Sequence, residues 1–118
     1  MNWFKIFPAD VFKSPNFVKL FVINSKKICV VKVDNEFFAV QNKCPHAGAS
    51  LSSGFCINKK IVCSYHRFEY DLVTGKGSPG QNDYIDTFPM DCRKDGLYIG
   101  FKETNTIYKK LLGWLLKE

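Results

Sequence analysis

Two short motifs constrain this chain more than any other feature of its sequence. The 118 residues include only two histidines, and each stands close to a cysteine, in Cys44-Pro-His46 and in Cys63-Ser-Tyr-His66. Residues 47–62 separate the two pairs. Alternate residues of an extended loop point to the same face, so a single loop can present a thiolate and an imidazole together. The fold must therefore bring two such loops around one object.

The ligand types indicate a metal centre. Two thiolates and two imidazoles are the ligand set of a 2Fe-2S cluster in which His replaces Cys on one iron. Zinc is the alternative, because Cys2His2 is one of its normal ligand sets, usually with Cys-x(2-4)-Cys and His-x(3-5)-His spacing. Here each loop is mixed, which lets both thiolates bind one iron and both imidazoles the other. A zinc-binding interaction module therefore stays open as the weaker hypothesis.

Length and charge limit the rest of the molecule. With 46% hydrophobic residues and eleven Phe, 118 residues can fill one core and leave little room for a second domain. The formal net charge of +6 comes mostly from scattered lysines, as in Lys26-Lys27, Lys59-Lys60 and Lys109-Lys110. A nucleic-acid groove would cluster Arg with interleaved aromatics. We therefore expect no nucleic-acid partner, and a lysine surface that suits acidic proteins.

The cysteines and the apolar segments indicate a compartment. Five cysteines are an odd count, which argues against a framework of paired disulfides. Cys29 and Cys92 lie in apolar or strand-like runs, where we expect buried thiols that act as small hydrophobes. Residues 1–11 contain no uninterrupted apolar core of an export signal, and no segment reaches the length of a membrane span. These features predict a soluble protein in the reducing cytoplasm.

Short strands dominate the expected secondary structure. Runs rich in Val, Ile and Phe, separated by turn residues, predict strands at 17–21, 27–33, 36–41, 55–57, 61–62, 69–72 and 97–101. The first ligand pair then follows one strand end directly, and the strand at 61–62 delivers Cys63. Residues 104–118 differ, because the apolar residues of 107–116 fall on one face of a helical projection, as in a short amphipathic helix.

The two motifs and their flanks resemble a Rieske domain. The resemblance rests on Cys44-Pro-His46-Ala-Gly48-Ala-Ser-Leu51-Ser, on Cys63-Ser-Tyr-His66-Arg-Phe-Glu-Tyr70-Asp71 and on the following Thr74-Gly75. It covers roughly residues 3–101 and is similar to the bacterial Rieske-type ferredoxins, including a proline-bearing third loop at Pro79. It implies an all-β fold, a Rieske-type antiparallel β-sandwich over 1–103. The cluster-binding loops would form a small subdomain at about 42–80, and the helix of 104–118 would follow.

The resemblance also implies a role for each ligand. Cys44 and Cys63 would bind the inner iron of one Rieske-type 2Fe-2S cluster. His46 and His66 would bind the outer iron through Nδ1, with their Nε2 edges toward solvent, where electrons would leave. Reduction would leave such a cluster less negative than a four-thiolate cluster, which is why His ligation raises the reduction potential.

Six neighbours are expected around the ligands: Gly48, Tyr65, Arg67, Phe68, Tyr70 and Pro79. High-potential respiratory Rieske proteins resemble this chain but carry a Ser two residues after the second His, a Tyr four after it, and a disulfide between the loops. Here Phe68 takes the place of the Ser, and Ala49 and Tyr65 stand where the disulfide cysteines would be. We therefore predict a potential in the lower part of the Rieske range, which Tyr70 would raise slightly. Arg67 stands where the family usually has Gly.

The function implied is that of a one-electron carrier that passes electrons from a reductase to a terminal oxygenase and catalyses nothing alone. A Rieske oxygenase would need two more His and a carboxylate for a mononuclear iron, and both histidines here are already used. The alternative is a Rieske-like small subunit or module of a larger oxidoreductase, of the nitrite reductase type. A free carrier is expected to be a monomer that meets acidic docking surfaces, with no membrane span.

Overall fold

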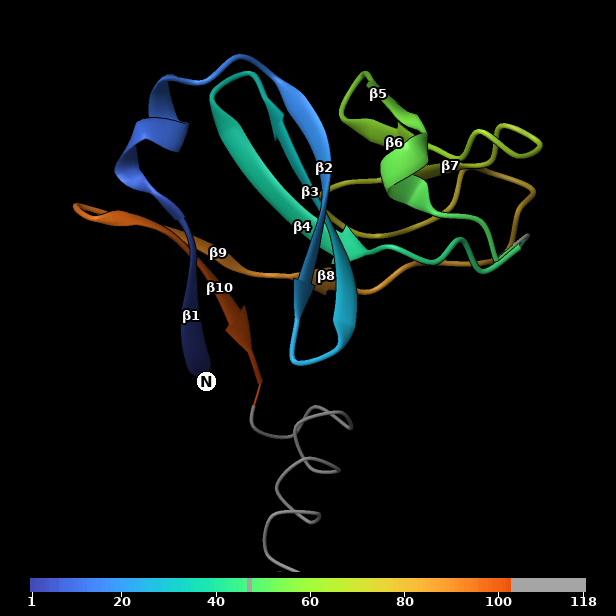
Figure 1. Ribbon diagram of the computed structural model, residues 1–118. Helices are drawn as coiled ribbons and strands as arrows, with labels where there is room; N and C mark the ends of the chain where they lie inside the picture. The colour runs from blue at the N-terminus through green and yellow to red at the C-terminus, as the bar shows by residue number, and fades with distance from the viewer. Residues whose placement is uncertain (47, 103–118) are drawn as a thin grey trace, which may run out of the picture. The chain divides into compact units, whose positions relative to one another are not determined.

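The computed structural model describes residues 1–46 and 48–102. The amphipathic helix expected over 104–118 lies outside these residues. The described chain consists of short strands with two turns of 3-10 helix (Figure 1). Its internal contacts divide it into two compact units, one of Met1–Phe12 with the described residues from Pro89 onward and one of Lys13–Phe88.

The first unit contains a three-stranded antiparallel sheet in the order β1-β10-β9. Its strands are β1 (Asn2–Pro8), β9 (Met90–Arg93) and β10 (Gly96–Phe101). The first strand of the chain pairs with the last, with Asn2 opposite Phe101. Leu97 and Ile99 on β10 are buried, and the Arg93 guanidinium lies 4.2 Å from the centre of the Tyr98 ring. The 3-10 helix η1 (Ala9–Lys13) follows β1.

The second unit contains two sheets. The larger is antiparallel, in the order β2-β3-β4-β8. Its strands are β2 (Phe17–Ile23), β3 (Lys26–Val33), β4 (Glu36–Gln41) and β8 (Thr87–Phe88). Asn24 and Ser25 join β2 to β3 with φ of 50° and 64°, and Asp34 and Asn35 join β3 to β4 with φ of 51° and 60°. Two successive positive φ angles are what a type I′ turn requires, and such turns match the twist of a hairpin.

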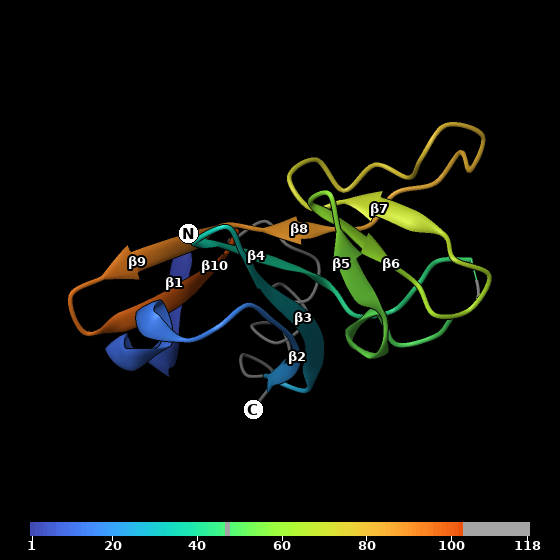
Figure 2. The same ribbon diagram turned by 90° about the horizontal axis from the view of Figure 1, so that it is seen from above.

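The smaller sheet carries the second ligand motif. It is antiparallel in the order β5-β6-β7, and the three strands lie side by side in Figure 2. They are preceded by a 3-10 turn, with bounds η2 (Leu51–Ser53), β5 (Phe55–Ile57), β6 (Lys60–Val62) and β7 (Glu69–Asp71). Asn58 and Lys59 form a third type I′ turn, with φ of 51° and 58°.

One core cluster joins the two sheets of the second unit. Its buried members come from both sheets and from the loops between them: Cys29, Val31, Val40, Cys44, Leu51, Ile61, Cys63, Tyr70, Leu72 and Ile85. Both motif cysteines belong to this cluster. The packing that stabilises the second unit therefore also fixes the two thiols.

The local strand predictions are confirmed, with small shifts at the ends. β2 extends to Ile23, β3 begins at Lys26, and β7 ends at Asp71. The all-β antiparallel class is confirmed, while β1 was not predicted. In the part of the chain that is described, no helix is long and apolar enough to span a membrane.

Candidate metal centre

The first ligand loop runs from β4 to η2 and is closed by its own backbone. The Cys44 N–H donates to the Ala49 carbonyl at 2.8 Å, and the Gly48 N–H donates back to the Cys44 carbonyl at 2.7 Å. Gly48 has a φ of +70°, which a residue without a Cβ adopts without strain. The buried Asn42 closes the base of the loop, since its Oδ1 accepts the Ser52 N–H at 2.9 Å. The loop thus holds the Cys44 backbone from both sides.

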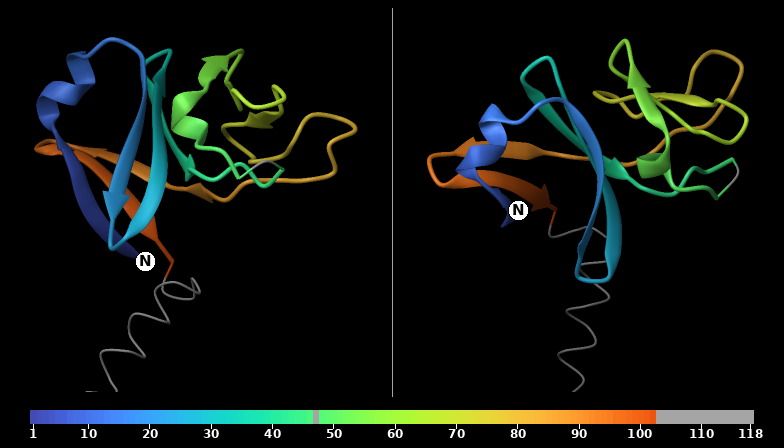
Figure 3. Two further views of the ribbon diagram at one scale, coloured as in Figure 1. Left: turned by 45° about the vertical axis from the view of Figure 1, so that its right-hand side comes forward. Right: turned by 45° about the horizontal axis from the view of Figure 1, so that its top comes forward.

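The second ligand loop connects β6 to β7. The Cys63 N–H donates to the Phe68 carbonyl at 2.8 Å, so the loop is a closed extension of the β6–β7 hairpin. His66 and Arg67 have φ of 64° and 55°, in the left-handed region. This geometry gives a physical reason why Gly is usual at the position of Arg67, because only Gly enters the region without a steric cost. Both views in Figure 3 show the two ligand loops at the same end of the second unit.

The two thiols lie together beneath the loops. Cys44 and Cys63 are both fully buried, with 0% exposure. Burial raises the pKa of the Cys63 thiol, a backbone hydrogen bond from Tyr65 opposes this, and the neighbouring Cys44 thiol adds to the rise. The Cys63 thiol is therefore harder to deprotonate than an ordinary cysteine. A bound iron would favour the thiolate, because metal ions deprotonate the cysteines that coordinate them.

The two imidazoles lie together on the outside. His46 and His66 are exposed, with ring centres 5.4 Å apart and planes at 68°. The Phe68 ring stacks on His46 at 4.0 Å and 11°, and the exposed Tyr65 meets His66 edge-on at 5.3 Å. The structure thus places Tyr65 against the His66 ring and Phe68 against the His46 ring. The stacking of Phe68 on His46 was not predicted.

The donors are paired by type. The thiols are buried side by side and the imidazoles are exposed side by side, although each sequence motif contains one of each. Within residues 1–46 and 48–102, no group of three or more His, Cys, Asp or Glu side chains is arranged to hold a single metal ion. Pairing by type is what a two-iron cluster with thiolates on one iron and imidazoles on the other requires. The donor set therefore fits such a cluster.

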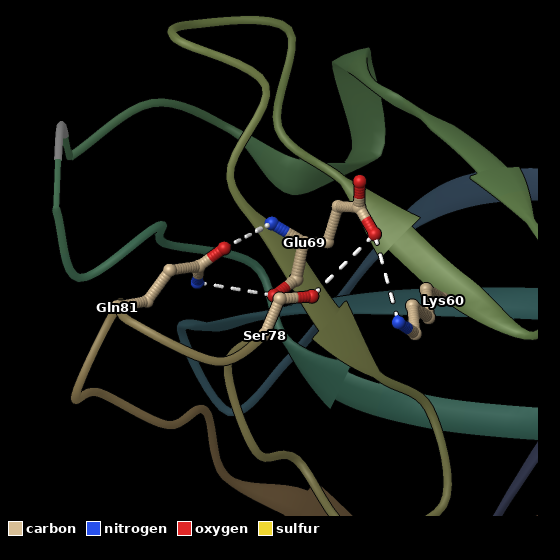
Figure 4. Close-up of polar contacts among 4 residues, drawn as sticks. All are labelled: Lys60, Glu69, Ser78 and Gln81. Atoms are coloured by element: carbon tan, nitrogen blue, oxygen red, sulfur yellow. Dashed lines mark hydrogen bonds and ion pairs between the residues drawn. The ribbon is translucent and has the colours of Figure 1, made fainter.

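The third loop is anchored to β7 rather than standing free. Pro79 and Gly80 are the central residues of a β-turn closed by the Gln81 N–H and the Ser78 carbonyl at 3.0 Å, and Gly80 has a φ of +95°. Gln81 grips the backbone of Glu69, because its Oε1 accepts the Glu69 N–H at 2.9 Å and its Nε2 donates to the Glu69 carbonyl at 3.1 Å. Figure 4 shows this clamp beside the ion pair of Lys60 and Glu69, whose Nζ and Oε1 are 3.7 Å apart.

A further turn connects β7 to this loop. The Asp71 Oδ1 accepts the backbone N–H groups of Val73 at 2.8 Å and Thr74 at 2.9 Å. These bonds, above all that from Thr74, hold the pKa of the Asp71 carboxyl below its usual range, against a smaller effect of burial. Gly75 follows with a φ of +79°, and a Cβ there would collide with the Ile85 carbonyl oxygen. The Thr74-Gly75 pair that supported the family resemblance therefore has a steric role.

The chain can now be compared with known proteins. The sequence profile of the Rieske [2Fe-2S] domain matches residues 2–89. The chain belongs to the Rieske [2Fe-2S] domain family. The cofactor expected from the two motifs, one Rieske-type 2Fe-2S cluster, is thereby confirmed.

Several relatives of this chain are named as ferredoxin components or subunits. The ferredoxin component of the naphthalene 1,2-dioxygenase/salicylate 5-hydroxylase systems of Ralstonia sp is 36% identical over 70 residues, which are 58% of this chain and 66% of that protein. The biphenyl dioxygenase ferredoxin subunit of Pseudomonas sp. (strain KKS102) is 35% identical over 80 residues, 66% of this chain and 73% of that protein. Against the first curated relatives, the chain spans 52% to 66% of their length.

A solved structure shows the same Rieske fold. The ferredoxin of carbazole 1,9a-dioxygenase from Nocardioides aromaticivorans IC177 matches with a TM-score of 0.75 and 20% identity, over 86% of this chain and 100% of that one. At this identity the likeness shows the fold alone. It agrees with the antiparallel strands of the two units described above.

Tyr70 has a partner that the motifs do not reveal. Its ring is fully buried, its hydroxyl donates to Asp83 Oδ2 at 2.9 Å, and its oxygen lies 3.7 Å from Cys44 Sγ. Burial raises the pKa of Tyr70 well above its ordinary range, and the contacts with Cys44 and Asp83 raise it further. The hydroxyl therefore keeps its proton. Asp83 in turn accepts a hydrogen bond from Gln81 Nε2 at 3.2 Å.

Sequence reasoning missed part of this site and misplaced one cysteine. Asp83 and Gln81 lie in a loop without a spacing rule, so no local signal points to them. Cys92 was expected to be buried and is exposed, which corrects that prediction. It lies on β9, which pairs with β10 on one side only and ends its sheet. Cys29 is fully buried on the central strand β3, as predicted.

Proposed function

We propose that this protein is a one-electron carrier, a Rieske-type ferredoxin that takes an electron from a reductase and passes it to a terminal oxygenase in the cytoplasm. One observation carries the proposal: two exposed imidazoles lie side by side, and the cysteine of each of their two loops is buried. The proposal is supported by relatives that are named as ferredoxin components or subunits of dioxygenases.

The ligand assignment follows the pairing by type. Cys44 and Cys63 would hold the inner iron, and His46 and His66 would hold the outer iron. When bound, the 2Fe-2S cluster supplies reversible one-electron chemistry. The four side chains neither make nor break covalent bonds in the transfer, because one electron enters and one electron leaves.

The buried cysteines are shielded from water, and the exposed histidines are open to contact with a partner. The core cluster around Cys44 and Cys63 keeps water away from the sulfurs, which limits hydrolysis and sets the local dielectric. The exposed edges of His46 and His66 can approach a partner surface closely.

The charges on the ligand loops suit an acidic partner. Lys43 precedes the first cysteine, Arg67 follows the second histidine, and both are exposed. Complementary charge mainly accelerates encounter, and salt screens it. The rate of electron transfer to the oxygenase should therefore fall steeply as ionic strength rises, and a rate independent of salt would contradict an acidic docking surface.

The proposal is tested with the purified full chain in a reconstituted dioxygenase system. Addition of the chain to a flavin reductase and an oxygenase should support oxygenation in proportion to its concentration, with a redox titration that fits one electron. Cys44→Ser is the matched control and should abolish both. Stable co-purification with a larger oxidoreductase, and failure to shuttle, would instead support the role of a fixed small subunit.

A further inference from the structure

The structure assigns Asp83 a role in setting the reduction potential: its carboxylate accepts the hydrogen bond that the Tyr70 hydroxyl would otherwise donate to the Cys44 sulfur, and so keeps the potential low. This inference rests on the proposed ligation of the cluster by Cys44. Asp83 acts through Tyr70, as a positioning residue. The sequence alone had suggested that Tyr70 raises the potential.

The Tyr70 hydroxyl can donate only one hydrogen bond. A phenol hydroxyl has one proton to donate, and Tyr70 donates it to Asp83 Oδ2 at 2.9 Å. The distance from the same oxygen to Cys44 Sγ is 3.7 Å. When Cys44 is a metal-bound thiolate, its sulfur carries no proton and can only accept. The Tyr70 oxygen then faces the sulfur with lone pairs rather than with a hydrogen.

The two acceptors that compete for this hydrogen bond, the Asp83 carboxylate and the Cys44 sulfur, differ in strength. Hydrogen bonds to a carboxylate are charge-assisted and shorter than those between neutral groups. A thiolate shared with iron has part of its charge neutralised, so Asp83 is the stronger acceptor.

Asp83 is held in place by hydrogen bonds from two neighbours, Gln81 and Gly77. Gln81 Nε2 donates to Asp83 Oδ1 at 3.2 Å while it also grips β7, and the Gly77 N–H donates to the Asp83 backbone carbonyl at 2.9 Å. A Cβ at Gly77 would collide with the Asp83 carboxylate. The carboxylate therefore occupies a space that the neighbouring glycine leaves open, and it cannot easily turn away from Tyr70.

The consequence for the reduction potential follows from charge. Hydrogen bonds to a ligand sulfur favour the reduced, more negative state. Because Tyr70 donates to Asp83, the Cys44 sulfur does not receive such a bond. The negative charge of the Asp83 carboxylate lowers the reduction potential further. Loss of the carboxylate should free the Tyr70 hydroxyl to turn toward Cys44 and raise the potential.

The experiment is a double-mutant cycle on the cluster-loaded full chain, with midpoint potentials from protein-film voltammetry. Asp83→Ala should raise the midpoint potential by an amount equivalent to about a tenfold change in the reduction equilibrium, about 59 mV for one electron. Tyr70→Phe alone should change it little. In the Tyr70→Phe background, Asp83→Ala should retain only the smaller shift that comes from loss of one charge.

Controls separate the hydrogen bond from other effects. Glu69→Gln removes a carboxylate charge from the same network without touching the Tyr70 hydroxyl, and it reports the shift due to charge alone. Asp83→Asn keeps the size of the side chain and should give a smaller positive shift that again depends on Tyr70. Resonance Raman spectra give a second readout, since the iron–cysteine stretch should shift in Asp83→Ala only where Tyr70 is present.

Two results would overturn the assignment. A clear fall in potential for Tyr70→Phe alone would show that the hydroxyl already donates to sulfur. If Asp83→Ala shifts the midpoint potential equally in the unmodified chain and in the Tyr70→Phe variant, Asp83 acts only through its charge. Failure of the unmodified chain to give a Rieske signal in electron paramagnetic resonance would instead refute the proposed ligand set, which keeps the two failures distinct.

Discussion

Replacement of Phe68 by Leu tests whether the stack on His46 helps to hold the outer ligand. The two rings are 4.0 Å apart and nearly parallel, at 11°. Phe68 is half-buried and packs against the core cluster, so Leu keeps most of the apolar contact and removes the ring. The change therefore isolates the stacking of the two rings from burial.

The expected magnitude follows from the energy of aromatic pairs. Such a pair is worth about 0.5–1.5 kcal/mol beyond the burial of its area. If release of His46 precedes loss of the cluster, loss of about 1 kcal/mol accelerates that release about fivefold at 25 °C. A smaller additional loss of unfolding free energy is expected from the reduced apolar contact.

The assay follows bleaching of the visible absorption when the loaded protein is mixed with an excess of an iron chelator. Phe68→Leu should bleach about fivefold faster than the unmodified protein, by the estimate above. Phe68→Tyr keeps a ring and should restore the original rate. Phe55→Leu is the matched control, because Phe55 lies on β5 of the same small sheet and is 45% exposed.

Two outcomes would refute this reasoning. Equal bleaching rates for Phe68→Leu and the unmodified protein would mean that the stack contributes nothing to His46 retention. Equal acceleration in Phe68→Leu and Phe68→Tyr would assign the effect to packing of the side chain rather than to the ring stack.

Three further predictions concern the rest of the second unit and the exposed thiol. Asp71→Ala should lower the unfolding free energy by roughly 0.5–1 kcal/mol, because a partly exposed acceptor of two backbone N–H groups is lost. Since the pKa of Asp71 is lowered from 3.8 in the fold, this contribution is fully present well above pH 3.8 and is lost as the pH falls through the lowered pKa; a difference between variant and parent in denaturant titrations that does not shrink as the pH is lowered below 3.8 would contradict it. In alkylation at pH 8 with detection by mass spectrometry, Cys92 should react while Cys29 does not, since burial raises the pKa of Cys29 to about 12; early labelling of Cys29 would disprove its burial. Gly75→Ala should cost more than about 1 kcal/mol, because its positive φ and the clash with the Ile85 carbonyl both oppose a Cβ, and an unchanged melting temperature would refute the described turn.

Local patterns predicted the hairpins of the second unit well. β2, β3 and β4 alternate with Asn, Asp and Ser residues that accept positive φ, so strands and turns are both encoded within a few residues. The small sheet was predicted for the same reason, because Asn58 and Lys59 separate two short apolar runs. Each of these pairings is local, and the sequence therefore contains its full signal.

Pairing between strands that are far apart in the sequence could not be predicted. β1 pairs with β10 at the other end of the described chain, with Asn2 opposite Phe101, and no pattern within residues 1–11 reveals that partner. β8 has only two residues, Thr87 and Phe88, and exists because β4 offers it an edge. The exposure of Cys92 depends on the same three-dimensional context, since β9 ends its sheet.

The candidate site divides in the same way. Type and spacing alone named the four candidate ligands, because a two-iron cluster needs donors that few other sites combine, and their ligation stays a prediction. Asp83 was not predicted, since its contact with Tyr70 depends on how the third loop folds back against β7. Phe68 was recognised as unusual from its position, but only the structure shows that its ring lies on His46.

The most direct test of the ligand set is electron paramagnetic resonance with nitrogen-sensitive pulsed detection on the reduced protein, labelled with ¹⁵N only in histidine. His46 and His66 are the only histidines in the chain, so any coupled histidine nitrogen must come from them. We predict a rhombic Rieske signal with couplings to two ¹⁵N nuclei, and to one in His46→Cys. A colourless protein without a signal, or a reduced cluster without histidine coupling, would contradict the assignment.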